Sequence, residues 1–299
     1  MKEARAVQIR DAPLERTLAD YVELTKPRLN LLVVATSAAG YYLGAPGTPE
    51  IVPLAHAVAG TALVAAGAAV LNQVYERDTD ALMLRTRMRP LPDGRIAPAD
   101  ARLFGLLLAF AGLAVLAALA NLLAAALALV TLVVYLGVYT PMKRRSPTST
   151  LVGAVPGALP PLIGWAASHG RLAAGGVALF AIVFLWQIPH FMAIAWMYRD
   201  DYRNAGLPML PVIEPDGRRT GWNAVVYALL LLPAGVAPTL VGMSGGAYAA
   251  VALALGTALV SLAIQFRRTR TDASARRLFF ASIVYLPLIW IAMIADKVP

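Results

Sequence analysis

Long runs of apolar residues alternate with short charged segments along most of this 299-residue chain. Residues 103–142 and 220–266 contain no Asp, Glu, Lys or Arg. Because about 20 apolar residues cross a bilayer as a helix, each of these stretches can hold two membrane-spanning helices. The runs are continuous and do not alternate between apolar and polar positions, which disfavours a transmembrane β-barrel.

This pattern predicts an all-α integral membrane protein with about nine transmembrane helices. The expected spans are 29–45, 51–72, 103–120, 122–142, 150–168, 174–197, 221–241, 246–265 and 278–295. Residues 1–28 are expected to form a cytoplasmic N-terminal tail, and residues 29–299 a single polytopic domain. The composition agrees, because only 14% of the residues are charged, whereas soluble proteins carry about 25%.

The net charge of +9 is distributed by side of the membrane. With nine spans, 24 of the 26 Lys and Arg residues fall in the tail and in the loops on its side, and Arg171 and Lys297 lie opposite. The positive-inside rule then places the N-terminus in the cytoplasm and the C-terminus on the other side of a bacterial inner (cytoplasmic) membrane. Basic residues separated by spans do not form a nucleic-acid-binding domain. Without cysteine, disulfides and thiolate metal sites are excluded.

A first polar cluster lies where an apolar run meets a basic loop. Asn72, Glu76 and Asp80 recur every four residues, so on a helix they form one stripe. Carboxylates are costly at a membrane boundary and are rarely kept there without a polar or cationic partner. Oxygen ligands on one face suit Mg²⁺, which takes one or two carboxylates and fills its other positions with water and phosphate oxygens. The alternative is a solvated helix end with carboxylate–arginine pairs.

A second polar cluster ends a later apolar run. His190 and Asp201 are eleven residues apart and share a helical stripe, and Asp200 lies about 80° round. The two carboxylates could take a second Mg²⁺. His190 either contacts substrate or is a buried histidine that bonds to backbone loosened by Pro189. The other two histidines lie far from every carboxylate and are given no role.

Basic residues follow both the second and the fourth expected span. They are Arg85, Arg87, Arg89, Lys143, Arg144 and Arg145. One guanidinium group can bind two phosphate oxygens at once, and lysine adds a point charge. Tyr139 and Thr140 could position a further diphosphate oxygen. Two acidic clusters with these cations predict a diphosphate held through divalent metal, although positive-inside retention beside anionic lipid explains part of the set equally well.

The fifth expected span is rich in Gly and Pro between residues 152 and 161. Such a segment is expected to kink or unwind, which a membrane tolerates only where the backbone packs on protein or lines a cavity. It could form a wall of an apolar substrate tunnel. Close packing between helices is an equally good explanation.

The two acidic clusters resemble the signatures of the UbiA-type intramembrane prenyltransferases. The first signature, Asn-x₃-Asp-x₃-Asp, is matched with Glu76 in place of the middle Asp. In the second, Asp-rich signature, His190 stands at the first Asp position, Met197 at a further one, and Asp200 and Asp201 remain. This departure favours the branch of the family that farnesylates haem. Residues 25–28, 76–90, 186–191 and 200–211 look like that branch, and the resemblance runs from about residue 20 to the C-terminus.

The resemblance implies a fold and a reaction. Nine helices would surround a central cavity, with Mg²⁺ as cofactor and farnesyl diphosphate bound at the cytoplasmic side. The farnesyl chain would be attached to a vinyl group of haem b, giving haem O and diphosphate. A haem A synthase is a further expected partner, as recipient of the product. The alternatives are another prenyl acceptor, such as 4-hydroxybenzoate or a chlorophyll precursor, and a secondary transporter, which the position of the carboxylates at helix ends disfavours.

The resemblance also implies roles for individual residues. The expected catalytic metal ligands are Asn72, Glu76 and Asp80 for one Mg²⁺, and Asp200 and Asp201 for another. The expected substrate-binding residues are Arg85, Arg89, Lys143, Arg144, Tyr139, His190 and Tyr202.

Overall fold

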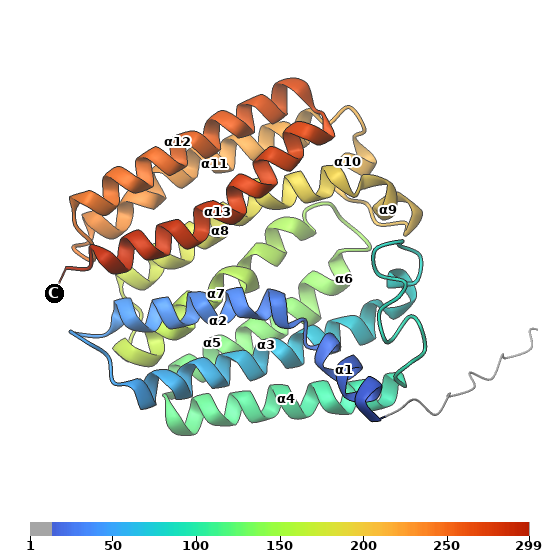
Figure 1. Cartoon of the computed structure of the whole chain (residues 1–299), viewed down its shortest axis with the longest axis horizontal. Coiled ribbons are helices and arrows are strands. Elements are labelled where there is room, and N and C mark those ends of the chain that lie inside the picture. The colour runs from blue at the N-terminus through green and yellow to red at the C-terminus, as the bar shows by residue number, and fades with distance from the viewer. Residues whose placement is uncertain (1–13, 299) are drawn as a thin grey trace, which may run out of the picture.

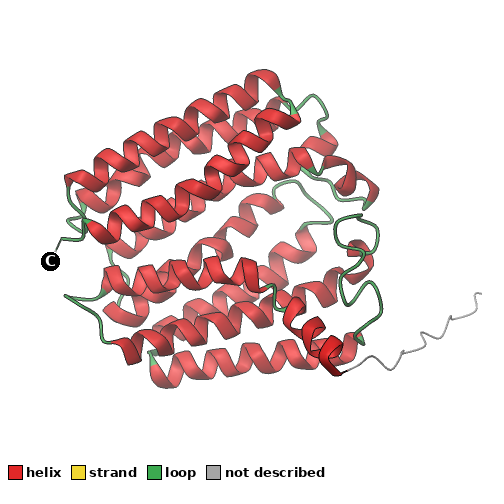
Figure 2. Cartoon of the chain, viewed as in Figure 1, coloured by secondary structure: helices red, strands yellow, loops and turns green. Residues whose placement is uncertain are grey.

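The computed structural model describes residues 14–298, which form a bundle of helices (Figures 1 and 2). The helices are α1 (Leu14–Leu24), α2 (Pro27–Gly44), α3 (Ile51–Asp80), α4 (Pro98–Leu119), α5 (Leu122–Val133), the π-helix η1 (Val134–Tyr139), α6 (Thr140–Met142), α7 (Ser149–His169), α8 (Ala174–Met197), α9 (Arg199–Asn204), α10 (Leu210–Ile213), α11 (Arg218–Leu240), α12 (Gly246–Thr269) and α13 (Asp272–Ala295). Residues 1–13 of the expected tail lie outside the described residues, and α1 forms the rest of it.

Within residues 14–298, eight helices are long and apolar enough to cross a membrane, counting residues 122–142 as one. The remaining expected span, 29–45, coincides with α2, which packs along α7. Helices therefore occupy all nine expected spans, and the all-α polytopic fold is confirmed. Figure 1 shows α1, α9, α10 and the connection 81–97 at one end of the bundle, and the α2–α3 connection and the C-terminus at the other.

Local sequence determines where many of the helices begin and end. Asn121 caps α5 by accepting a hydrogen bond from the Ala124 amide at 2.8 Å, and Thr271 caps α13 with a reciprocal bond to Ser274. Gly170 ends α7 with a φ of 72°, a left-handed conformation that glycine adopts without steric cost.

Helix α7 stays helical from Ser149 to His169, with Pro156, Pro160 and Pro161 inside it. The expected unwinding of this segment is therefore wrong, and close packing accounts for its composition. A Cβ atom at Gly164 would overlap the Ser37 carbonyl of α2. Small residues let neighbouring backbones approach closely in a membrane, so α2 is held tightly against α7.

The π-helical turn η1 was not expected from the sequence. The helix is wider between Val134 and Tyr139, and the Thr140 hydroxyl donates to the Tyr135 carbonyl at 2.7 Å. Such turns place an extra residue in a helix and occur frequently at functional sites. Here the short helix α6 separates the π-helical turn from Lys143.

Candidate active site

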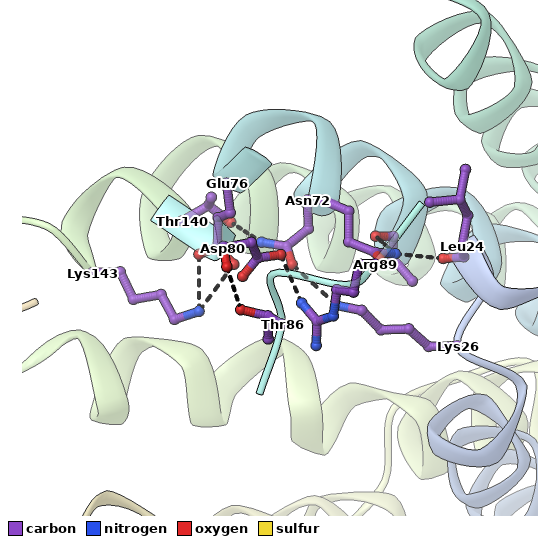
Figure 3. Close-up of polar contacts among 11 residues, drawn as sticks. Leu24, Lys26, Asn72, Glu76, Asp80, Thr86, Arg89, Thr140 and Lys143 are labelled. Atoms are coloured by element: carbon purple, nitrogen blue, oxygen red, sulfur yellow. Dashed lines mark hydrogen bonds and ion pairs between the residues drawn. The ribbon is translucent and has the colours of Figure 1, made fainter. Parts of the chain in front are cut away.

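Helix α3 continues beyond the apolar run and carries Asn72, Glu76 and Asp80 on one face. These three residues are only 2%, 8% and 1% exposed, respectively. The shared face is the one that the four-residue spacing predicts, and Figure 3 shows the three side chains together. Their burial sets them apart from a solvated helix end.

Three cations from separate segments meet this face (Figure 3). Lys143, just after α6, donates to both Glu76 carboxylate oxygens at 2.8 and 3.1 Å. Arg89, in the connection after α3, donates to Asp80 Oδ2 at 2.7 Å. Lys26 Nζ, just before α2, lies 3.3 Å from Asn72 Oδ1. The Asp80–Arg89 pair matches the alternative expectation of carboxylate–arginine pairs, but it is buried on the Asp80 side.

A second set of hydrogen bonds orients this polar face. Asn72 Nδ2 donates to Thr140 Oγ1 at 3.1 Å, so Thr140 contacts α3 as well as η1. The Thr86 hydroxyl donates to the Asp80 backbone carbonyl at 2.7 Å, which fixes the connection 81–97 over the end of α3. Arg144 donates to Thr79 Oγ1 at 2.5 Å. Arg144 therefore lies beside the carboxylates without pairing with them.

Lys26 was not among the expected site residues. The φ of Lys26 is 51°, a left-handed conformation that is uncommon for a residue with a side chain. The Nζ atom of Lys26 points towards Asn72. Burial, followed by the charge of Arg89, lowers the pKa of Lys26 to about 8. The available sequence signal is a lysine before the proline that begins an apolar helix, but its partner is 46 residues away.

The Tyr139 ring lies between Lys143 and helix α7. It stacks on Tyr135 with centroids 5.5 Å apart, and Lys143 Nζ is 5.4 Å from its centroid. A Cβ atom at Gly153 would overlap the Tyr139 ring, so the ring rests on the α7 backbone. Burial alone would lower the pKa of Lys143, but Tyr139 and the Glu76 carboxylate together outweigh it and the pKa is raised.

The second acidic cluster does not contact the first. Asp200 is largely exposed and pairs with Arg203 at 2.5 Å, and Asp201 is half-buried in α9. Among residues 14–298, no three Asp, Glu, His or Cys side chains are grouped closely enough to hold a metal. The five expected metal ligands are therefore placed as a trio and a separate pair.

The segments that carry the two clusters nevertheless pack together. The Arg85 guanidinium lies 4.7 Å from the Tyr198 ring centroid and 6.0 Å from that of Tyr202, a favourable cation–π arrangement. Met83 packs with Leu207 and Met209. The connection 81–97 thus covers α9 and α10, and Arg85 and Tyr202 meet at this contact.

His190 lies inside α8, apart from the carboxylates. Its Nδ1 is 2.8 Å from Ser282 Oγ on α13. The expected bond to loosened backbone is replaced by a bond to a side chain on another helix, so α8 and α13 together fix the imidazole.

The α3 trio has the donor set that Mg²⁺ prefers. Glu76 and Asp80 supply two carboxylates one helical turn apart, and Asn72 supplies an amide oxygen. Mg²⁺ is commonly held by one or two carboxylates with substrate phosphates and water, so a third protein carboxylate is not required. Lys26, Arg89 and Lys143 lie where they could bind the remaining phosphate oxygens.

The model of the UbiA prenyltransferase family matches residues 33–284. The chain belongs to the UbiA prenyltransferase family. Among its relatives, "Protoheme IX farnesyltransferase" of Solibacter usitatus is 45% identical over 289 residues, covering 94% of this chain and 99% of that protein. The protein of the same name from Opitutus terrae is 46% identical over 280 residues, covering 93% and 95%.

Solved UbiA structures share this fold. A UbiA homolog from Archaeoglobus fulgidus bound to DMAPP and Mg²⁺ aligns with a TM-score of 0.65 at 18% identity, over 92% of this chain and 99% of that one. A structure described as digeranylgeranylglyceryl phosphate synthase aligns with a TM-score of 0.79 at 17% identity, over 94% and 98%. The UbiA resemblance and the assignment to an enzyme family are confirmed, and the secondary-transporter alternative is not supported.

Proposed function

We propose that this UbiA-family enzyme transfers the farnesyl group of farnesyl diphosphate to a vinyl group of protohaem IX (haem b), giving haem O and diphosphate. The observation that carries the proposal is the buried α3 face, where Glu76 and Asp80 meet two cations in the bundle. The 45% identity to a protoheme IX farnesyltransferase over 94% of the chain supports this acceptor over 4-hydroxybenzoate or a chlorophyll precursor.

The α3 face divides the binding of the diphosphate between two kinds of side chain. Asn72, Glu76 and Asp80 would hold Mg²⁺, which when bound neutralises charge on the leaving diphosphate. Lys143 and Arg89 exchange their carboxylate partners for diphosphate oxygens. The Arg89 guanidinium can bind two of these oxygens at once, and Lys143 binds as a point charge. Lys26 contributes a third cation. These groups are positioned before the reaction, so stabilising the leaving charge needs little reorganisation.

Transfer begins as the bond between farnesyl C1 and the diphosphate oxygen breaks and the electron pair leaves with diphosphate. The vinyl π electrons then form the new carbon–carbon bond with C1. The positive charge passes to the carbon beside the porphyrin, where water adds and loses a proton to leave a hydroxyl group. Tyr139 places an aromatic face next to Lys143, and Tyr135 stacks on Tyr139; such faces stabilise a nearby cation.

Asp200 and Asp201 are proposed to hold a second Mg²⁺ against the other side of the diphosphate. Arg85 and Tyr202 would line this side, and Arg144 would lie at its edge. The packing of the connection 81–97 on α9 and α10 supports this arrangement, because it brings both acidic segments to one end of the bundle.

The proposed location is a bacterial inner membrane, with the N-terminus and the site on the cytoplasmic side. Lys297 Nζ donates to the carbonyls of Tyr42 and Ala45 at 2.8 Å each, so the C-terminal segment lies at the opposite end from Asp80. A haem A synthase is the proposed recipient of the product, since a farnesylated porphyrin is too apolar to leave the membrane readily.

The acceptor is tested by product analysis. The purified protein is incubated with Mg²⁺, farnesyl diphosphate and equal amounts of haem b and 4-hydroxybenzoate, and both acceptors are analysed by mass spectrometry. We expect the porphyrin to gain one farnesyl group and one hydroxyl group. Farnesylation of 4-hydroxybenzoate with unchanged haem would overturn the proposed acceptor, and no transfer to either would overturn the proposed reaction.

A further inference from the structure

The His190 imidazole is held between two aromatic rings. Trp186, one turn earlier on α8, stacks with its centroid 5.1 Å away at 21°. Phe279 of α13 stacks at 5.0 Å and 24°. Trp186 Nε1 also donates to the Ser282 carbonyl at 2.7 Å, which fixes α8 to α13 at this level. Since neighbouring rings stack on it, the imidazole can contact a ligand mainly through its edge.

The hydrogen bond to Ser282 determines which ring nitrogen carries the proton. A hydroxyl group has one hydrogen, and Ser282 Oγ donates it to the Phe279 carbonyl at 2.6 Å. Ser282 Oγ must therefore accept from His190, 2.8 Å away. In the neutral imidazole the proton is then on Nδ1, and Nε2 keeps its lone pair.

Nε2 is not fully enclosed by the protein. The bond from Nδ1 is the one hydrogen bond of the His190 side chain to residues 14–298. Some polar side-chain atoms of those residues are fully buried without a hydrogen-bond partner, and Nε2 is not one of them. An accessible nitrogen lone pair, with the other nitrogen bonded to an oxygen acceptor, is the arrangement found in histidines that bind metals.

His190 is linked to the prenyl site through α7. Gln187, one turn before His190, donates to the Ala154 carbonyl of α7 at 3.2 Å. The neighbouring residue Gly153 supports the Tyr139 ring, which lies beside Lys143. A planar ligand held at His190 would therefore be bound on α8 one turn from the residue that contacts α7 beside the Tyr139 ring.

We propose that Nε2 of His190 is the axial ligand of the haem iron and holds the acceptor porphyrin for farnesyl transfer. This inference rests on the proposed function. Neutral imidazole is a common axial ligand of haem iron. Neither of the other histidines can supply a second ligand, because His56 lies near the start of α3 and His169 Nδ1 bonds to Gly44 at the opposite end of the bundle.

The test measures the iron ligand directly. The ferrous haem complex of the full-length protein is treated with nitric oxide, and its electron paramagnetic resonance spectrum is recorded with natural-abundance histidine and with ¹⁵N-histidine. We expect a triplet splitting from the nitrogen trans to nitric oxide, changing to a doublet on labelling. His190→Ala should abolish the splitting, and His169→Ala, the matched control, should retain it.

The wild-type spectrum decides the proposal even if His190→Ala fails to fold. Haem that binds and is farnesylated without a histidine splitting would overturn the inference alone. A splitting that survives His190→Ala would also overturn it. If the wild-type protein neither binds nor farnesylates haem, both the inference and the proposed function fail.

Discussion

Glu76 and Asp80 each face a cation, and this pairing explains how two carboxylates are retained at a buried helix end. A buried charge without a partner costs several kcal/mol, and removing one member of a buried pair costs about 3–5 kcal/mol. Lys143 and Arg89 satisfy the carboxylates at 2.8 and 2.7 Å. Arrival of Mg²⁺ with diphosphate would give every group a new partner of opposite charge, so binding leaves no charge stranded.

Replacing Lys143 tests this exchange. We expect Lys143→Gln to lower kcat/KM for farnesyl diphosphate on the order of 10²-fold, because a fixed cation at the leaving group is lost. Arg145→Gln is the matched control, since Arg145 is exposed and makes no ion pair within residues 14–298. Steady-state kinetics should show little change for it. Equal losses in the two variants would contradict a specific role for Lys143.

Lys26 should make substrate binding depend on pH. Burial and then Arg89 lower its pKa to about 8, so the free enzyme loses this charge as the pH rises through 8. If the charged form binds diphosphate, affinity for farnesyl diphosphate should fall by up to about tenfold per pH unit above 8. In Lys26→Arg, which stays charged, binding measured by calorimetry should be flatter between pH 7 and 9. The same steep decline in both proteins would exclude Lys26 as its source.

At this scale, local spacing predicts only part of the site. Asn72, Glu76 and Asp80 could be placed on one face because four-residue steps nearly complete a helical turn. The Lys26 contact and the stacking of Arg85 on Tyr198 join residues far apart in the chain. No periodicity encodes such contacts, so they depend on how the helices pack.

At the scale of elements, glycines set the distance between helices. Gly40 of α2 lies against the Pro161 backbone, and Gly164 of α7 lies against Ser37. The two helices therefore meet through backbone, where dispersion contacts and weak hydrogen bonds drive association in lipid. This contact holds Lys26 at one end of α2 in a fixed position relative to the rest of the site.

A methyl group at this contact should weaken the bundle. We expect Gly164→Ala to destabilise the protein by about 1–3 kcal/mol, as overpacking typically does, because the new Cβ would overlap the Ser37 carbonyl. Gly246→Ala is the control, since a Cβ there meets no atom within 4 Å. Thermal unfolding in detergent should show a lower Tm for Gly164→Ala alone. An unchanged Tm would mean that α2 can shift freely.

The elements also show where composition misleads. Residues 152–161 look too rich in Gly and Pro for a regular helix, yet α7 is continuous, because packing against α2 and α8 compensates for the missing hydrogen bonds. The π-turn at Val134–Tyr139 is the reverse case, an irregular helix whose composition does not indicate one. Its sequence is ordinary and apolar, and contacts of Thr140 with Asn72 and Tyr135 accompany the extra residue.

At the scale of the whole molecule, hydropathy predicts where the long apolar helices lie, because the membrane requires about 20 apolar residues for each span. Among residues 14–298, the buried carboxylate–cation pairs lie at one end of the bundle. At the other end, Lys297 donates to the Tyr42 and Ala45 carbonyls, in the last turn of α2 and just after it. Which loops converge was not predictable from hydropathy, since it depends on packing such as that of Met83 on Leu207.

The most direct test compares two aspartates on the same turn of α3. Asp80 is 1% exposed and pairs with Arg89, whereas the Asp78 side chain is 81% exposed and pairs with Arg77. The rate of haem b farnesylation is measured for Asp80→Asn and Asp78→Asn in protein of matched thermal stability. We expect Asp80→Asn to lose on the order of 10²- to 10³-fold and Asp78→Asn to stay within about twofold of the parent. Near-parental activity in folded Asp80→Asn would contradict the assignment of the α3 face as the diphosphate site.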